Sequence, residues 1–88
     1  MGKVKVVHYL NQFFAGIGGE EKADTLPHIA ESQPPISQQL QKLIEEDAEI
    51  VGVVVCGDSY FNENLEEAKA KVLEMIKSFN PDILIAGP

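Results

Sequence analysis

Two segments of the chain hold most of the side chains that could bind or transform a small molecule. Residues 16–21 place three glycines beside two carboxylates, and residues 56–60 offer a thiol, a carboxylate, a hydroxyl and a phenol. Each segment follows an apolar run, as does the closing Ala86-Gly87-Pro88. In an open α/β sheet, the loops that leave parallel strands converge on one edge, where ligands bind. We therefore expect these loops to meet at a ligand site.

The glycine-rich segment has three possible interpretations. Gly16-x-Gly18-Gly19 invites comparison with a dinucleotide fingerprint, but the third glycine is misplaced and the two following carboxylates would repel a diphosphate. The same carboxylates suit a cationic group, such as the ammonium of an amine, held against glycine backbone. The segment could also be a flexible turn whose acidic residues begin a helix. We assign substrate contacts to Gly18, Gly19, Glu20 and Glu21.

The second segment adds Cys56, Asp58 and Tyr60 to the predicted substrate-binding residues. Cysteine is among the most buried residue types, so Cys56 could equally pack as a small apolar group. Asp58 could simply cap a turn. No residue of the segment is assigned a catalytic role.

The two histidines are assigned no function. His8 lies in the first apolar run, where a hydrogen-bonded core histidine is the simpler interpretation. We expect His28 to be exposed and, like the acidic residues at 45–47, to lie away from the loops. One cysteine and two histidines without a CxxC pair do not complete a zinc site within this chain, so we predict no metal.

Composition excludes several classes of function. The 88 residues include 7 basic and 14 acidic side chains, and the net charge of −7 opposes binding to nucleic acid or to an anionic membrane. The apolar runs are much shorter than the roughly 20 residues of a membrane helix. A single cysteine fits a reducing compartment, so we predict a cytoplasmic protein.

The apolar patterns predict the elements that position these loops. Residues 3–10, 49–55 and 82–86 are predicted strands, because they are short, apolar and rich in β-branched residues. Helical spacing predicts helices over residues 36–47 and from residue 64 for about four turns, with Asn64 and Glu67 as a capping box. A short helix is expected within residues 20–32, limited by Pro27. The expected fold is a single α/β domain over residues 1–88 with a three-stranded parallel sheet and flanking helices, half of a doubly wound, Rossmann-like sheet.

Three motifs, taken in order, resemble a known family. They are His8-Tyr9-Leu10-Asn11-Gln12-Phe13-Phe14 continuing through Gly16-Ile17-Gly18-Gly19-Glu20-Glu21-Lys22-Ala23-Asp24, then Val55-Cys56-Gly57-Asp58-Ser59-Tyr60-Phe61-Asn62-Glu63-Asn64, then Asn80-Pro81-Asp82 with Ile85-Ala86-Gly87-Pro88. They resemble the N-terminal region of selenoprotein B of the glycine, sarcosine, betaine and D-proline reductase family. The resemblance covers nearly the whole chain.

The resemblance implies a role in amino-acid fermentation. Protein B of that family takes an amine or amino-acid substrate, cleaves its carbon–nitrogen bond reductively and passes a carboxymethyl group to protein A, and protein C forms acetyl phosphate. The family's redox selenocysteine lies beyond the region matched, so we expect no cofactor in this chain and no reductase activity from it alone. We expect an N-terminal fragment of a longer protein that supplies pocket loops and an assembly surface.

The sequence leaves one alternative open and disfavours another. The chain could be a stand-alone α/β binding or scaffold module without catalysis, whereas Glu20 and Glu21 disfavour a flavin or nucleotide domain. In either case we expect a homo-oligomer or association with a missing remainder, because a three-stranded sheet leaves apolar edges.

Overall fold

The sheet is organised around strand β1 (Val4–Leu10), which lies between two parallel neighbours. The computed structural model describes residues 3–87, and within them the strand order is β2-β3-β1-β4. Strand β3 (Ala48–Val55) and strand β4 (Ile83–Ala86) run parallel to β1, and β2 (His28–Ile29) runs antiparallel to β3. The parallel arrangement of the three predicted strands is confirmed.

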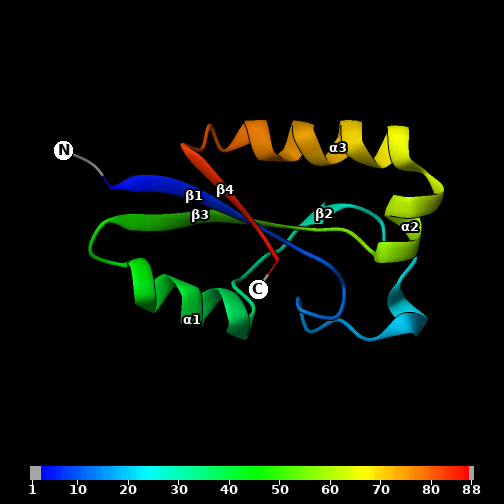
Figure 1. Ribbon diagram of the computed structural model, residues 1–88, viewed down its shortest axis with the longest axis horizontal. Helices are drawn as coiled ribbons and strands as arrows, with labels where there is room; N and C mark the ends of the chain where they lie inside the picture. The colour runs from blue at the N-terminus through cyan, green and yellow to red at the C-terminus, as the bar shows by residue number, and fades with distance from the viewer. Residues whose placement is uncertain (1–2, 88) are drawn as a thin grey trace.

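Helices cover both faces of this sheet, as Figure 1 shows. Helix α1 (Pro35–Ile44) lies just before β3 on one face, and helix α3 (Leu65–Ser78) precedes β4 on the other. The chain moves outward from β1 to β3 and then back past β1 to β4. Right-handed crossovers in opposite directions must lie on opposite faces, which gives the doubly wound arrangement that the sequence predicts.

Alternation along β1 divides the apolar side chains into two cores. Val6 and Leu10 pack with β3 and the apolar side of α1, whereas Val7 packs with Ala68, Val72 and other residues on the α3 face. A central strand buried on both faces needs a nearly continuous apolar sequence, and the sequence of β1 provides it.

The sheet has a fourth strand that the sequence does not predict. The expected helix within residues 20–32 is wrong: only Glu20–Lys22 forms a 3₁₀ turn, η1, and residues after Pro27 extend as β2. Proline has no backbone N–H to continue a helix. Ile29 then pairs with Val54, and the N–H of Ala30 donates to the carbonyl of Val53 at 2.9 Å. The sheet is therefore mixed and four-stranded rather than three-stranded and parallel.

A second difference concerns the start of α3. Residues 58–63 form an extra short helix, α2 (Asp58–Glu63), directly before it. The predicted capping box is wrong, because Asn64 makes no side-chain cap and its amide instead donates to the carbonyl of Tyr60 at 3.3 Å. Asn64 thus closes α2 and joins it to α3.

Strand β3 has a register shift next to Gly52, a position where the Phe79 ring leaves no room for a side chain. Its register with β1 shifts between Val6 and Val7, where Val6 faces Ile50 and Val7 faces Gly52. The ring of Phe79, which follows α3, lies over Gly52, and a Cβ at this position would come within 2.4–2.6 Å of the ring carbons. The missing side chain therefore makes room for an aromatic ring of the α3 core.

No helix within residues 3–87 is long and apolar enough to span a membrane.

Substituting Gly52 with alanine should destabilise the protein, because the added methyl group overlaps the Phe79 ring. We expect Gly52→Ala to lower the free energy of unfolding by about 1–3 kcal/mol in urea denaturation followed by circular dichroism. In a Phe79→Ala background the same substitution should cost much less. An equal cost in the two backgrounds would show that the Phe79 contact is not the cause.

Candidate functional site

The loops that leave β1, β3 and β4 begin side by side. Leu10 pairs with Val55, and Tyr9 pairs with Ala86, so three parallel strands end at one edge of the sheet. The expectation that these loops share an edge is correct. The strand order places the topological switch point between β1 and β4, which is where ligands bind in doubly wound sheets.

A buried glutamine joins the two loops that the sequence singled out. The Gln12 side chain is 3 % exposed; its Oε1 accepts from the Asp58 N–H at 3.0 Å and its Nε2 donates to the Gly19 carbonyl at 3.3 Å. The Gln12 carbonyl also accepts from the N–H groups of Ile17 and Gly18. One side chain thus fixes the glycine-rich loop against the start of α2.

Asn11 adds a second link between the same loops. Its Nδ2 donates to Oδ2 of Asp58 at 3.1 Å, and its Oδ1 accepts from the Phe14 N–H at 2.9 Å. The Asp58 carboxylate therefore orients Asn11 rather than capping its own helix, for which the structure has no side-chain cap. Sequence reasoning missed both amides as site residues; the available signal was two amides directly after a buried strand.

Gly57 lets a third segment pack against these loops. Its N–H donates to the Thr25 carbonyl at 2.9 Å, and the Tyr60 N–H donates to the Ala23 carbonyl at 3.0 Å. A Cβ on Gly57 would approach the backbone of Ala23 and Thr25 to 2.3–2.7 Å. Only glycine allows this close approach of two backbones.

The two predicted ammonium-binding carboxylates both face solvent. Glu21 is exposed, and its Oε1 accepts from the Gly19 N–H at 3.1 Å. Hydrogen bonds from its own backbone and from Gly19 lower the pKa of Glu21, so this carboxylate stays ionised and stabilises its own loop. Glu20 is exposed in the first turn of η1. Recognition of an ammonium by either residue stays a prediction.

Cys56 and Tyr9 form a neutral pair under the loops. Cys56 is 1 % exposed and packs in the α3 core; burial raises the pKa of its thiol, the Asp58 charge raises it further, and hydrogen bonding with Tyr9 lowers it. Burial, with Cys56 and Asp58 nearby, raises the pKa of Tyr9 to about 12. Cys56 is therefore a buried thiol rather than a thiolate nucleophile.

The remaining predicted residues lie near this network. Gly18 and Gly19 are half-buried in the first loop, and the half-buried Tyr60 side chain packs against the α3 core. Asp58 is exposed. The cavities at this edge are lined by neighbours of the predicted residues rather than by those residues themselves, so their contact with substrate stays a prediction.

His8 is a structural residue, in agreement with the sequence interpretation. It is 1 % exposed, with Nε2 2.8 Å from the Gly87 carbonyl and Nδ1 2.7 Å from Oγ of Ser37. A carbonyl only accepts, so Nε2 carries the hydrogen and, in the neutral ring, Nδ1 accepts from the Ser37 hydroxyl. Both ring nitrogens are occupied, and His8 joins β1, α1 and the turn after β4.

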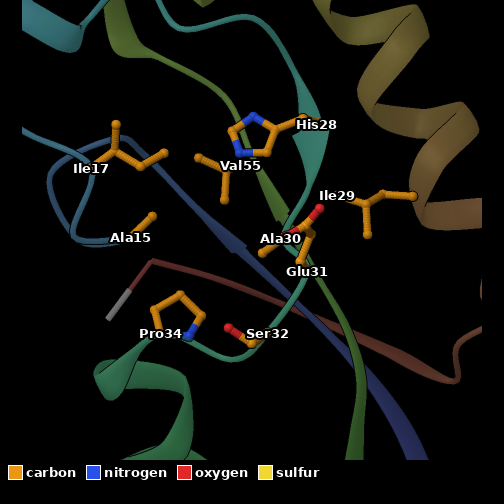
Figure 2. A pocket seen from close by; sticks show the side chains of 9 residues that line it. All are labelled: Ala15, Ile17, His28, Ile29, Ala30, Glu31, Ser32, Pro34 and Val55. Carbon is orange, nitrogen blue, oxygen red and sulfur yellow. The ribbon is translucent and has the colours of Figure 1, made fainter.

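His28 lies half-buried at the carboxyl edge, so the expectations that it is exposed and that it lies away from the loops are both wrong. It pairs with Val55 in β2, and its half-buried imidazole lines a cavity of about 450 Å³ (Figure 2). Its Nδ1 donates to the Leu26 carbonyl at 3.0 Å, which leaves Nε2 of the neutral ring as an acceptor. Figure 2 shows the ring beside Val55, on the side facing Ile17.

This cavity separates the first loop from the segment that enters α1. Its lining is both polar and apolar: the polar side chains are those of His28, Glu31 and Ser32, and the other lining residues are Ala15, Ile17, Ile29, Ala30, Pro34 and Val55. A smaller cavity of about 290 Å³ lies at the switch point and is lined by Tyr9, Asn11, Phe14, Ala86 and Gly87. Within residues 3–87, no group of three or more His, Cys, Asp or Glu side chains is placed to hold a metal ion.

The fold defines a doubly wound α/β protein with two cavities outside the carboxyl ends of its strands, the position at which such folds bind ligands. The family model for glycine/sarcosine/betaine reductase selenoprotein B matches residues 3–88. The chain belongs to this family. The resemblance inferred from the three motifs is thus confirmed, and Pro88, which ends the third motif, lies outside the residues that the structure describes.

Curated relatives match over nearly the full length of the chain. The glycine reductase complex component B subunit gamma of Peptoclostridium acidaminophilum is 72 % identical over 88 residues, 100 % of this chain and 20 % of that protein. From the same organism, the sarcosine reductase complex component B subunit beta is 49 % identical over 88 residues, 100 % of this chain and 20 % of that protein. The corresponding betaine reductase subunit beta is 36 % identical over 84 residues, 96 % of this chain and 19 % of that protein.

The chain spans about a fifth of the length of these relatives. Their names place them in reductase complexes that have further components. No solved structure matches the chain significantly.

Substituting Gly57 with alanine should disrupt the contact that positions the second loop. The added methyl group meets backbone atoms, which cannot rotate away, so we expect a loss of about 3 kcal/mol in the free energy of unfolding. Gly19→Ala is the matched control, because its methyl group meets only the Glu21 carboxylate, at 3.3 Å. Equal losses for the two variants in urea denaturation would contradict this account.

The raised pKa of Cys56 predicts that its thiol reacts slowly with alkylating reagents. Because the thiolate is the reacting form, a raised pKa and burial should make alkylation of the native chain at pH 8 at least about tenfold slower than alkylation of the urea-unfolded chain. The native rate should rise only above the usual cysteine pKa of about 8.5. A native rate equal to the unfolded rate at pH 8 would show that Cys56 is accessible and ionised.

Proposed function

We propose that this chain forms the N-terminal α/β domain of a component B subunit in a glycine, sarcosine or betaine reductase and supplies loops to its substrate pocket. The observation that carries the proposal is the Gln12 bridge, which joins Gly19 to Asp58 at the carboxyl edge of the sheet. Gln12 thereby holds Gly19 of the first motif next to Asp58 of the second motif, although the two residues are far apart in the sequence. The resemblance supports assembly with proteins A and C.

The cavity beside the first loop is the best candidate for the substrate compartment. Three large apolar side chains of this loop, Phe13, Phe14 and Ile17, are exposed, which is typical of a surface that meets a ligand or another part of an assembly. Ile17 lines the larger cavity and Phe14 the smaller one. The loop therefore contributes to both hollows at this edge.

The charge of this edge suits an amine. Glu20, Glu31 and Asp58 are exposed carboxylates, and the chain as a whole carries −7. Glycine, sarcosine and betaine, which the relatives' names mention, share a cationic nitrogen but differ in its number of N–H groups. Each also carries a carboxylate and has no net charge, so a carboxylate of this edge would hold the cationic nitrogen directly while the carboxylate of the substrate faces away from it. The predicted contacts of Gly18, Gly19, Glu20, Glu21, Asp58 and Tyr60 belong to this proposal, whereas Cys56, also predicted as a contact, is 1 % exposed and lies beneath the loops.

The proposal assigns no catalytic residue to this chain. Cys56 is a buried neutral thiol, and both nitrogens of His8 are used in structural hydrogen bonds. The family's selenocysteine, by resemblance, belongs to sequence beyond the matched region. The part played by this domain is to bind and orient the substrate, within a cytoplasmic assembly.

A full-length chimera tests the substrate pocket. This chain would replace the 88 matching residues of the Peptoclostridium acidaminophilum subunit, and glycine consumption would be measured with the other components of the complex. Ile17→Trp should narrow the cavity and raise the KM for glycine by about tenfold with little change in kcat, because it removes binding space rather than reacting groups.

Leu43→Trp is the matched control for this variant. Leu43 is 84 % exposed on α1 and lines none of the cavities described here, so its KM should stay at the parent value. A KM for Ile17→Trp equal to that of the parent chimera would show that the substrate does not bind in this cavity.

A further inference from the structure

The two edges of the sheet differ in how they are protected. On the β3 side, Gln41 of α1 accepts from the Ile50 N–H at 2.7 Å and donates to the Ala48 carbonyl at 3.2 Å, and β2 pairs with the far end of the strand. These contacts occupy the backbone groups that an added strand would use. Proteins commonly guard sheet edges in such ways, because an open edge pairs with other chains.

The β4 edge has no comparable protection among residues 3–87. Strand β4 pairs only with β1 and contains no charged residue, proline or bulge. Asp82, just before it, is already used: its Oδ2 accepts from the Lys5 N–H at 2.8 Å. Ile83 is 50 % exposed and Leu84 is 47 % exposed, although they lie on opposite faces of the strand.

An apolar groove continues this edge onto α3. It has a volume of about 330 Å³ and lies between Leu84 and the helix, and Leu73 on its wall is 46 % exposed. Lys69 supplies its only charge; the other lining residues are Tyr9, Phe61, Val72 and Ile76. An uncharged strand edge beside an apolar groove offers backbone pairing and side-chain burial together.

We propose that the β4 edge and this groove are covered by a strand and apolar side chains from the part of the component B polypeptide that this chain does not match. This inference rests on the proposed function. The relatives are about five times as long as the matched stretch, so the family possesses the sequence required. Doubly wound sheets also extend by adding strands beside existing ones.

The size of the surface favours this occupant over a second copy of the chain. Stable complexes between separate chains bury about 1,200–2,000 Å² in total. A strand of four residues and one small groove provide much less area. A segment of the same polypeptide needs no interface of that size, because its effective concentration is high.

Thiol labelling of Leu84→Cys tests the proposal in the 88-residue chain and in the full-length chimera described above. We expect the variant to react readily with a maleimide in the short chain and at least about tenfold more slowly in the chimera, where the edge is covered. Leu43→Cys on α1 is the matched control and should react quickly in both. The parent protein, whose Cys56 is buried, gives the background.

Two results would overturn the proposal. Equal labelling of Leu84→Cys in the short chain and the chimera would show that the edge stays open. If Leu84→Cys is already protected from the maleimide in the short chain, and this protection increases with protein concentration, the edge is covered by a second copy of the chain. Glycine turnover by the chimera is measured separately. If turnover is lost but Leu84→Cys is still protected from labelling, the proposed function is refuted and the covered edge is supported. If turnover is kept but Leu84→Cys is not protected, only the covered edge is refuted.

Discussion

Burial of β1 between two parallel neighbours is the constraint on which the rest of this structure depends. Val6, Val7, His8 and Leu10 are all 2 % exposed or less, so every second residue must find an apolar layer on one face and the remaining residues on the other. Helices α1 and α3 supply those layers. Because backbone groups of a buried strand must be paired on both sides, β3 and β4 flank β1, and their carboxyl ends are brought to one edge.

Two polar side chains at the end of β1 convert this packing into a defined site. A buried polar group without a partner costs on the order of 1–3 kcal/mol, and every side-chain nitrogen and oxygen of His8 and Gln12 has a hydrogen-bond partner. His8 connects β1 to α1 and to the turn after β4, and Gln12 connects the first loop to α2. The positions of all three strand-end loops relative to one another are therefore maintained by hydrogen bonds from one strand and the residues that follow it.

The chemistry of the edge follows from what these contacts leave accessible. The thiol and the core histidine are enclosed, whereas carboxylates, apolar loop residues and one nitrogen of His28 face the cavities or solvent. The Cys56 thiol and the His8 ring, each 1 % exposed, are therefore not accessible at this edge. An edge without an accessible thiol fits a family whose members are components of reductase complexes. This chain spans about a fifth of the length of those members.

Local patterns in the sequence determined the three main strands, the two long helices, the parallel arrangement and the family. These features depend on short-range periodicity and on motifs that can be compared directly, and apolar runs such as Val53 to Val55 allow few alternatives. Tertiary structure alone decided β2, α2, the bonding of Asn64 and the roles of Gln12 and His28. Each of these depends on a partner distant in sequence: Ile29 becomes a strand because Val54 offers a free edge, and Gln12 becomes a bridge because Asp58 and Gly19 lie on either side of it. A two-residue strand or a single buried amide leaves no periodic signal, so only the folded arrangement of distant segments reveals it.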